Sequence, residues 1–122
     1  MASPTGVRIS RQQVVEWAER SGCTDARLRT IALLTTEVVT NAVRHGPTHG
    51  EVTVSAISSS GGWYVAVSDE SVVVPVLRPV EPLSVGGRGI LLVDRLASAW
   101  GVDTLGARGK TVWFRVARWP EE

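Results

Sequence analysis

The stretch LLTTEVVTNAVRHG, residues 33–46, has the apolar spacing of an amphipathic helix and runs directly into a proline. Three polar side chains, those of Glu37, Asn41 and Arg44, line the border of the apolar stripe of that helix. The stripe itself consists of Ile31, Leu34, Val38 and Ala42. Polar groups at the edge of a core mark a candidate functional site.

Glu37 and Asn41 stand four residues apart, so their side chains project side by side from one helix face. A carboxylate in this position can orient water or a hydroxyl group, and the neighbouring amide oxygen can ligate Mg²⁺. The same spacing is common on ordinary solvated helix faces. The pair alone therefore leaves both interpretations open.

Composition predicts one domain over residues 1–122, because 43% of the residues are hydrophobic and the length is typical of a single domain. Residues 1–6 should be disordered, and residues 7–9 can form at most a very short strand. A net charge of +1 gives no basic field for nucleic acid or an anionic membrane. With one cysteine, Cys23, and no membrane-spanning apolar run, we expect a cytoplasmic protein.

Hydrophobic periodicity predicts two helices in the first half of the chain. A capping box that begins at Ser10 and a glycine stop at Gly22 place the first helix near residues 11–21. The second helix starts at Thr24 or Asp25 and continues to the glycine-proline pair that follows the quoted stretch.

The second half of the sequence predicts a sheet and a third helix. Residues 51–57 and 63–68 are rich in β-branched and aromatic residues and should form a hairpin. Three prolines make residues 69–87 a long loop, helical spacing follows over residues 90–100, and alternation over residues 111–117 predicts a last strand.

About three helices against one face of a mainly antiparallel, mixed sheet form a two-layer α+β sandwich. Most tryptophans should belong to its core rather than to a site, whereas Trp119 should be partly exposed. The expected core tryptophans are Trp17, Trp63, Trp100 and Trp113.

A glycine cluster, Gly86, Gly87, Arg88 and Gly89, stands immediately before the third predicted helix. Glycines let a backbone approach a phosphate closely, and the N–H groups at a helix start favour anions. A plain turn before a helix has the same composition. The cluster is thus a candidate phosphate site or an ordinary turn.

Three more positions are candidates with an ordinary alternative each. Asp69 directly follows a strand, where its carboxylate can accept a hydrogen bond from a ligand amino group or belong to a turn. Thr111, in the run GKT that opens the last strand, can offer a hydroxyl to a ligand. His45 follows Asn41 by one helical turn and can contact a ligand or cap the helix carbonyls.

In this order, the motifs resemble GHKL (Bergerat-fold) ATPase domains over about residues 10 to 117. Residues 36–45, TEVVTNAVRH, look like the anti-sigma-factor serine kinases of bacteria in their single-domain actinobacterial form. The resemblance implies that Glu37 polarises the attacking hydroxyl, that Asn41 ligates Mg²⁺, and that Asp69 binds the adenine amino group. The implied nucleotide-binding residues are Asn41, His45, Asp69, Gly86, Gly87, Arg88, Gly89 and Thr111.

This family resemblance implies an ATP-dependent serine/threonine-protein kinase that takes part in transcription regulation. Its cofactors would be ATP and Mg²⁺, its substrate a serine or threonine of a small antagonist protein, and its second partner a sigma factor. Homodimerisation is compatible with the family. Positioning and charge neutralisation would supply most of the catalysis.

Two departures from the family pattern favour an alternative. Ser71 replaces the family's glycine two residues after the adenine-binding aspartate, and residues 80–85 contain no arginine or lysine. The alternative is a binding module of the same fold that sequesters a regulatory partner without phosphoryl transfer.

Two other classes fit the sequence less well. A DNA-binding helix-turn-helix around Gly22 would need a basic recognition face, which the long second helix lacks. A sensor histidine kinase would need a phosphoacceptor helix pair before the ATP-binding motifs, and only about ten residues precede the first predicted helix.

Overall fold

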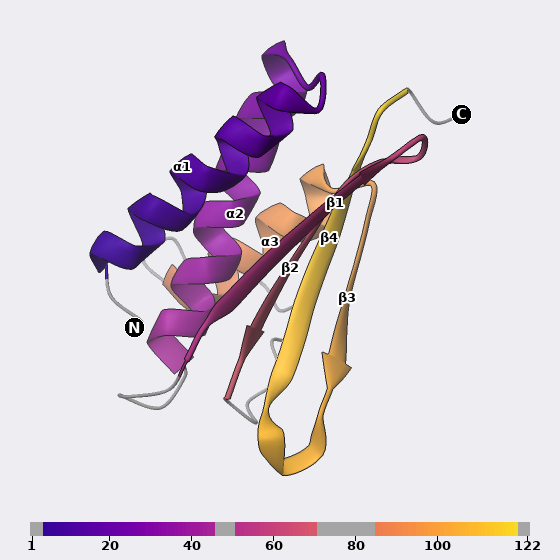
Figure 1. Ribbon diagram of the computed structural model, residues 1–122. Coiled ribbons are helices and arrows are strands. Elements are labelled where there is room, and N and C mark those ends of the chain that lie inside the picture. The colour runs from indigo at the N-terminus through magenta and orange to yellow at the C-terminus, as the bar shows by residue number, and fades with distance from the viewer. Residues whose placement is uncertain (1–3, 46–50, 71–84, 120–122) are drawn as a thin grey trace.

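The computed structural model describes residues 4–45, 51–70 and 85–119, which fold into two layers (Figure 1). One layer holds the helices α1 (Pro4–Arg20), α2 (Asp25–His45) and α3 (Val85–Leu96). The other is a sheet of the strands β1 (Thr53–Ser59), β2 (Gly62–Asp69), β3 (Ala99–Thr104) and β4 (Lys110–Ala117). The predicted α+β sandwich is confirmed.

The sheet has the strand order β1-β2-β4-β3, and each of its neighbouring pairs is antiparallel. The described strands therefore form a purely antiparallel sheet rather than a mixed one. The central pair joins β2 to β4, with Gly62 opposite Ala117 at one end and Asp69 opposite Lys110 at the other. The predicted hairpin is confirmed, with Ser59 paired to Gly62 across a two-residue turn.

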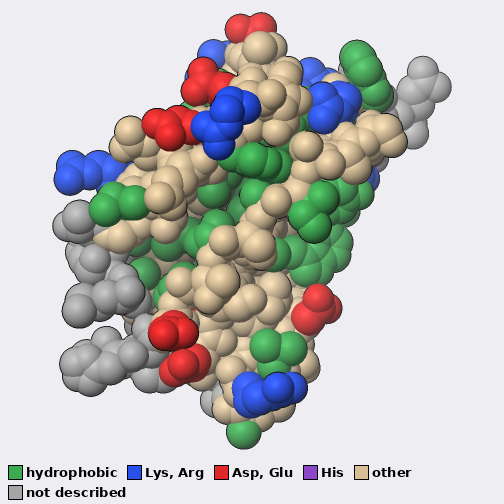
Figure 2. Space-filling model, in the orientation of Figure 1, with side chains coloured by type: hydrophobic (Ala, Val, Ile, Leu, Met, Phe, Trp, Pro, Cys, Tyr) green, Lys and Arg blue, Asp and Glu red, His purple; other side chains and the backbone are tan. Residues whose placement is uncertain are grey.

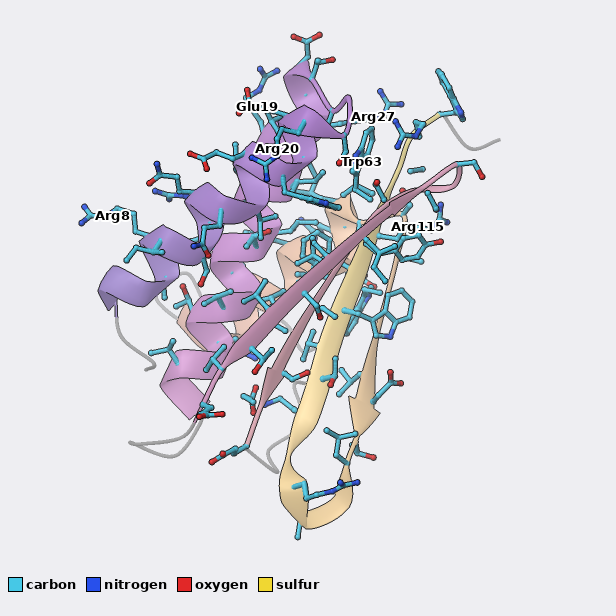
Figure 3. The ribbon with its side chains drawn as sticks, viewed as in Figure 1. Arg8, Glu19, Arg20, Arg27, Trp63 and Arg115 are labelled. Atoms are coloured by element: carbon cyan, nitrogen blue, oxygen red, sulfur yellow. The ribbon has the colours of Figure 1, made fainter. Side chains whose placement is uncertain are left out.

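Alternate residues of the two central strands face the helices and form the sheet's half of the core. Phe114 and Val65 are fully buried there, and Trp63 is 2% exposed, between the helices and the sheet (Figure 3). From α2 come Ile31, Leu34, Val38 and Ala42, all buried, which confirms the predicted apolar stripe.

On the face seen in Figure 2, charged side chains lie over the helices and at the ends of the sheet, and hydrophobic side chains lie between them. Arg8, Glu19 and Arg20 of α1 are all exposed (Figure 3). On the sheet face that points away from the helices, the Trp113 indole lies across Gly101, where an added Cβ would come within 2.8 Å of the ring nitrogen. Trp119 is exposed, as predicted.

Helix α1 ends as expected but begins earlier. The N–H of Cys23 donates to the Ala18 carbonyl at 2.9 Å, and Gly22, with φ of +90°, supplies the left-handed residue of this Schellman motif. The helix starts at Pro4, so the strand predicted at residues 7–9 was wrong and residues 4–6 are helical. Val7 packs against the core, which extends the apolar face of the helix by two turns beyond the expected start.

The third helix was misplaced by the prediction at both ends. It begins at Val85 rather than Ile90 and ends at Leu96, and Trp100 belongs to the unpredicted strand β3. The strand pairs with β4, and Gly101 lies opposite Trp113 with no room for a Cβ beneath the indole ring. This pairing joins distant residues, so local spacing does not report it. The Trp100 indole donates to Asp94 at 2.9 Å and ties β3 back to α3.

Most of the long loop predicted at residues 69–87, including residues 71–84, lies outside the described residues. In the part of the chain that the structure describes, no helix is both long and apolar enough to cross a membrane.

Candidate functional site

The second half of α2 places a carboxylate and an amide at the edge of the core. Glu37 is half-buried and Asn41 is 8% exposed, one helical turn further along. Both adjoin the buried residues Val38 and Ala42, so the predicted polar border of the apolar stripe is confirmed for these two residues. The side chains of Arg44 and His45 lie outside the described part of the structure.

A buried ion pair closes the end of the central strand pair. The Lys110 ammonium lies 3.0 Å from both carboxylate oxygens of Asp69, and the two side chains are 1% and 2% exposed. Asp69 makes at least one further interaction besides this pair. Asp69 is two residues from the core residue Val67 in β2, and Lys110 is two residues from the core residue Val112 in β4. Because side chains alternate along a strand, both side chains face the helices.

Gly109 lets the two strand ends approach each other at this pair. Its φ is +113°, and a Cβ on it would lie 2.0 Å from the Asp69 carbonyl oxygen and 2.6 Å from the Glu70 Cα. Only glycine fits such a close approach of two backbones. The glycine therefore positions Lys110 directly against Asp69.

Thr111 points to the opposite side of the sheet from Asp69. Its hydroxyl lies 2.7 Å from that of Ser68, its partner in β2, on the face away from the helices. A contact from the Thr111 side chain to a ligand beside Asp69 does not fit this register, and Lys110 occupies that side instead. Sequence analysis missed Lys110, although the alternation with buried Val112 and Phe114 contained the signal.

The glycine cluster lies in the first turns of α3 rather than in a turn before it, because the helix already begins at Val85. Gly86, Gly87 and Gly89 thus belong to the segment whose first N–H groups have no acceptor within the helix. Such a helix start attracts anions. The Arg88 side chain lies outside the described part of the structure.

These elements meet at one end of the molecule. The C-terminal ends of α2 and β2 and the beginning of β4 lie together at the lower end in Figure 1. Helix α2 packs directly on β2, β4 and α3. The arrangement brings the half that carries Asn41 to the same end as Asp69.

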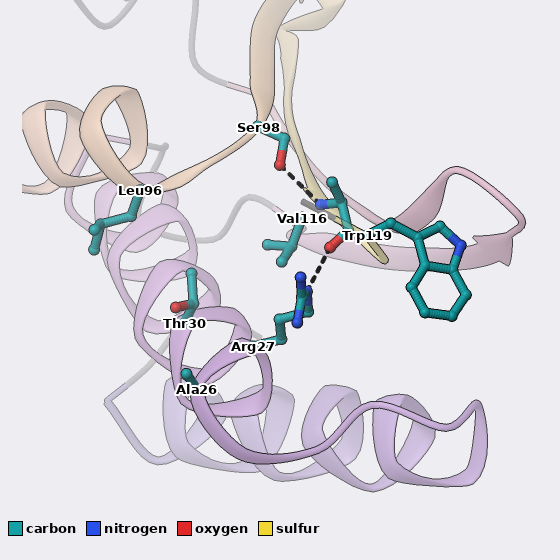
Figure 4. A pocket seen from close by; sticks show the side chains of 8 residues that line it. Ala26, Arg27, Thr30, Leu96, Ser98, Val116 and Trp119 are labelled. Carbon is teal, nitrogen blue, oxygen red and sulfur yellow. Dashed lines mark hydrogen bonds between the residues drawn. The ribbon is translucent and has the colours of Figure 1, made fainter. Parts of the chain in front are cut away.

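A cavity of about 450 Å³ lies at the opposite end of α2 (Figure 4). Within it, the Arg27 Nε donates to the Ala117 carbonyl at 2.8 Å, and the Ala117 N–H donates to the Ser98 hydroxyl at 2.8 Å. The lining residues are Ala26, Arg27, Thr30, Leu96, Ser98, Val116, Ala117 and Trp119. None of the catalytic or nucleotide-binding candidates from the sequence belongs to this cavity.

The two-layer arrangement of helices on an antiparallel sheet is like that of the GHKL ATPase fold. The family comparison agrees with this class. The chain belongs to the histidine kinase-like ATPase domain family, whose model matches residues 1–116.

Two solved structures of similar fold are histidine kinases. The histidine kinase domain of the blue-light activated histidine kinase from Erythrobacter litoralis EL346 has a TM-score of 0.56 and 28% identity, over 75% of this chain and 44% of that chain. The mycobacterial sensor histidine kinase MprB has a TM-score of 0.56 and 15% identity, over 96% of this chain and 97% of that chain. The chain thus spans less than half of the Erythrobacter kinase domain. No curated protein matches significantly.

Proposed function

We propose that this ATP-binding domain is an anti-sigma-factor serine/threonine kinase. It transfers the γ-phosphoryl group of ATP to a serine or threonine of an antagonist protein, and it sequesters a sigma factor when that antagonist is phosphorylated. It acts in the cytoplasm as a regulator of transcription. The family match and the likeness of residues 36–45 to these kinases support the proposal.

The observation that carries the proposal is the position of Glu37 and Asn41 at the core edge of α2, on the half of the helix that ends near Asp69. Glu37 is only half-buried, so a hydroxyl from another protein can reach its carboxylate. Glu37 accepts the proton of that hydroxyl while the oxygen bonds to the γ-phosphorus and the bond to the leaving ADP oxygen breaks.

The donor set of the site suits ATP with Mg²⁺. The amide oxygen of Asn41 is a hard ligand of the kind that Mg²⁺ takes, and the first turns of α3 present backbone N–H groups suited to phosphate oxygens. Asp69 offers a carboxylate to the adenine amino group. Bound Mg²⁺ would neutralise part of the phosphate charge.

The test is phosphoryl transfer from γ-labelled ATP to the small antagonist proteins encoded in the source genome, each purified separately. We expect label on one or a few of them, stable to acid as phosphoserine and phosphothreonine are. Acid-labile label would identify a phosphohistidine and contradict the proposal, as would the absence of transfer to any antagonist.

Two variants separate binding from transfer. Glu37→Gln should retain ATP binding and lose transfer, because it removes the proton acceptor and keeps the shape of the side chain. Asn41→Ala should lose Mg²⁺-dependent ATP binding, because the metal ligand is gone. Calorimetric titration with ATP, in the presence and absence of Mg²⁺, measures the binding, and the labelling assay with γ-labelled ATP measures the transfer.

A second candidate is a module of the same fold that sequesters its partner without transfer. The Asp69–Lys110 ion pair favours it, since an occupied carboxylate is less available to adenine. Binding of a sigma factor at full strength in the absence of ATP, together with no transfer, would support this second function.

A further inference from the structure

Lys110 is unusual in this chain before its contacts are considered. It is the only lysine among 13 lysine and arginine residues. It is also 1% exposed, whereas lysine is almost never fully buried unless it is paired. The chain places its single flexible ammonium group at the end of the central strand pair.

The ammonium of Lys110 contacts both oxygens of the Asp69 carboxylate. Its nitrogen lies 3.0 Å from Oδ1 and 3.0 Å from Oδ2, which places it between the two oxygens. A carboxylate has about four lone-pair positions. The lysine takes one on each oxygen, which reduces the acceptor capacity left for a ligand amino group. Asp69 makes at least one further interaction.

Fold stability alone does not explain the pair. A buried ion pair is commonly no more stabilising than two apolar side chains of similar volume, because both charges lose their hydration. The next pair on the same face of this ladder, Val67 opposite Val112, is apolar and buried. A buried pair on this face of the ladder can thus be apolar.

We propose that Lys110 is an internal competitor for the adenine-binding carboxylate, so that a base reaches Asp69 only when the ammonium leaves it. This inference rests on the proposed role of Asp69 in ATP binding. Lys110 thereby lowers the apparent affinity for ATP by a constant factor, set by the fraction of molecules in which the ammonium has left Asp69. Its long unbranched side chain can leave by bond rotation, without movement of β4.

The single lysine makes the exchange measurable in the unaltered protein. An amine-acylating reagent can modify only Lys110 and the chain's α-amino group, and mass spectrometry separates the two. We expect Lys110 to react slowly alone and at least about tenfold faster with saturating ATP and Mg²⁺, as the ammonium loses its charge-assisted hydrogen bonds. Inosine triphosphate, which has a carbonyl in place of the amino group, is the matched control and should not accelerate the reaction.

A variant tests the same competition through affinity. Lys110→Thr should bind ATP about tenfold more tightly than the wild type, because the base no longer displaces a charged group. Lys110→Arg keeps the cation and should bind no more tightly than the wild type. Circular dichroism shows whether each variant is folded, and the labelling of the wild type does not depend on them.

The outcomes distinguish this inference from the proposed function. Calorimetric ATP binding in the wild type, combined with unchanged labelling of Lys110, overturns the competition and leaves the ATP site standing. Equal affinity in folded Lys110→Thr and the wild type does the same. No heat of binding at millimolar ATP in either protein refutes the proposed function and this inference with it.

Discussion

Two adjacent threonines inside α2, Thr35 and Thr36, differ in whether their hydroxyl groups have a hydrogen-bond partner among the described residues. The hydroxyl of Thr35 is fully buried and has no hydrogen-bond partner in the described part of the chain, whereas the Thr36 hydroxyl donates to the Ala32 carbonyl at 3.0 Å. A buried unpaired hydroxyl costs free energy that a methyl group of the same shape does not.

Thr35→Val should therefore stabilise the protein, by about 1–2 kcal/mol in the free energy of unfolding. Thr36→Val is the matched control, because it removes a hydroxyl that has a partner, and it should be neutral or slightly destabilising. Urea denaturation of the three proteins measures the difference. A Thr35→Val protein less stable than the wild type would show that the hydroxyl does have a partner.

The buried thiol of Cys23 predicts a pH dependence of stability. Burial raises the pKa of this thiol, against the smaller opposing effects of the Arg27 and Arg118 guanidinium groups. The folded protein therefore keeps the thiol proton to higher pH than the unfolded chain. The thiol makes its full contribution to the free energy of unfolding below the pKa of an unfolded cysteine, about 8.5. This contribution falls as the pH rises above that value.

Unfolding measured from pH 7 to 10 should show this loss in the wild type and less of it in Cys23→Ala, which lacks the titrating group. The two proteins are compared by the slope of the free energy of unfolding against pH. The cavity left by the smaller side chain shifts this free energy equally at every pH and does not affect the slope. Identical slopes would refute the assignment.

At the scale of elements, the turn between β3 and β4 fixes the candidate site. Gly106 and Gly109 both have positive φ, of +63° and +113°, but a Cβ on Gly106 would meet nothing within 4 Å. A Cβ on Gly109 would collide with the backbone at Asp69. A side chain at position 106 would therefore cost only the free energy of a positive φ, whereas a side chain at position 109 would also collide with the backbone of β2.

Gly106→Ala should destabilise the protein by about 1 kcal/mol, the cost of a left-handed conformation. Gly109→Ala should cost clearly more, because β2 and β4 must also separate, and it should expose Lys110 to acylation in the absence of ATP. Thermal unfolding and the labelling rate measure the two effects. Equal destabilisation by both substitutions would contradict the close approach seen at Asp69.

Elements defined by local periodicity could be predicted from the sequence, and those defined by distant contacts could not. Helix α2 and the hairpin follow from spacing and turn residues alone. Strand β3 is defined by its pairing with β4, where Gly101 lies beneath Trp113. Local spacing does not show this pairing, and the apolar residues before Gly101 have the spacing of a helix end. In the candidate site, Glu37, Asn41 and Asp69 were recognisable by motif. Alternation along β4 could have shown the face that Lys110 occupies, but only the register of β4 against β2 shows that Lys110 lies opposite Asp69.

At the scale of the whole molecule, ATP binding and stability are linked. A ligand that binds only the folded state at 100 times its dissociation constant adds about 2.7 kcal/mol to the free energy of unfolding. Saturating ATP with Mg²⁺ should stabilise the wild type and Glu37→Gln alike, and should stabilise Asn41→Ala little. Thermal shift measurements test this, and an undiminished shift in Asn41→Ala would argue against its role as the metal ligand.

The pairing of β2 with β4 also orders events while the chain is being made. Strand β2 is complete at Asp69, but the strand that pairs with it begins only at Lys110. The helical hairpin and the first two strands thus leave the ribosome before the centre of the sheet can close. During that interval β2 has one unpaired edge next to an apolar face, the kind of surface to which chaperones bind. Nascent chains that stop short of β4 should therefore be the lengths most dependent on chaperones, and completion of β4 should end that dependence.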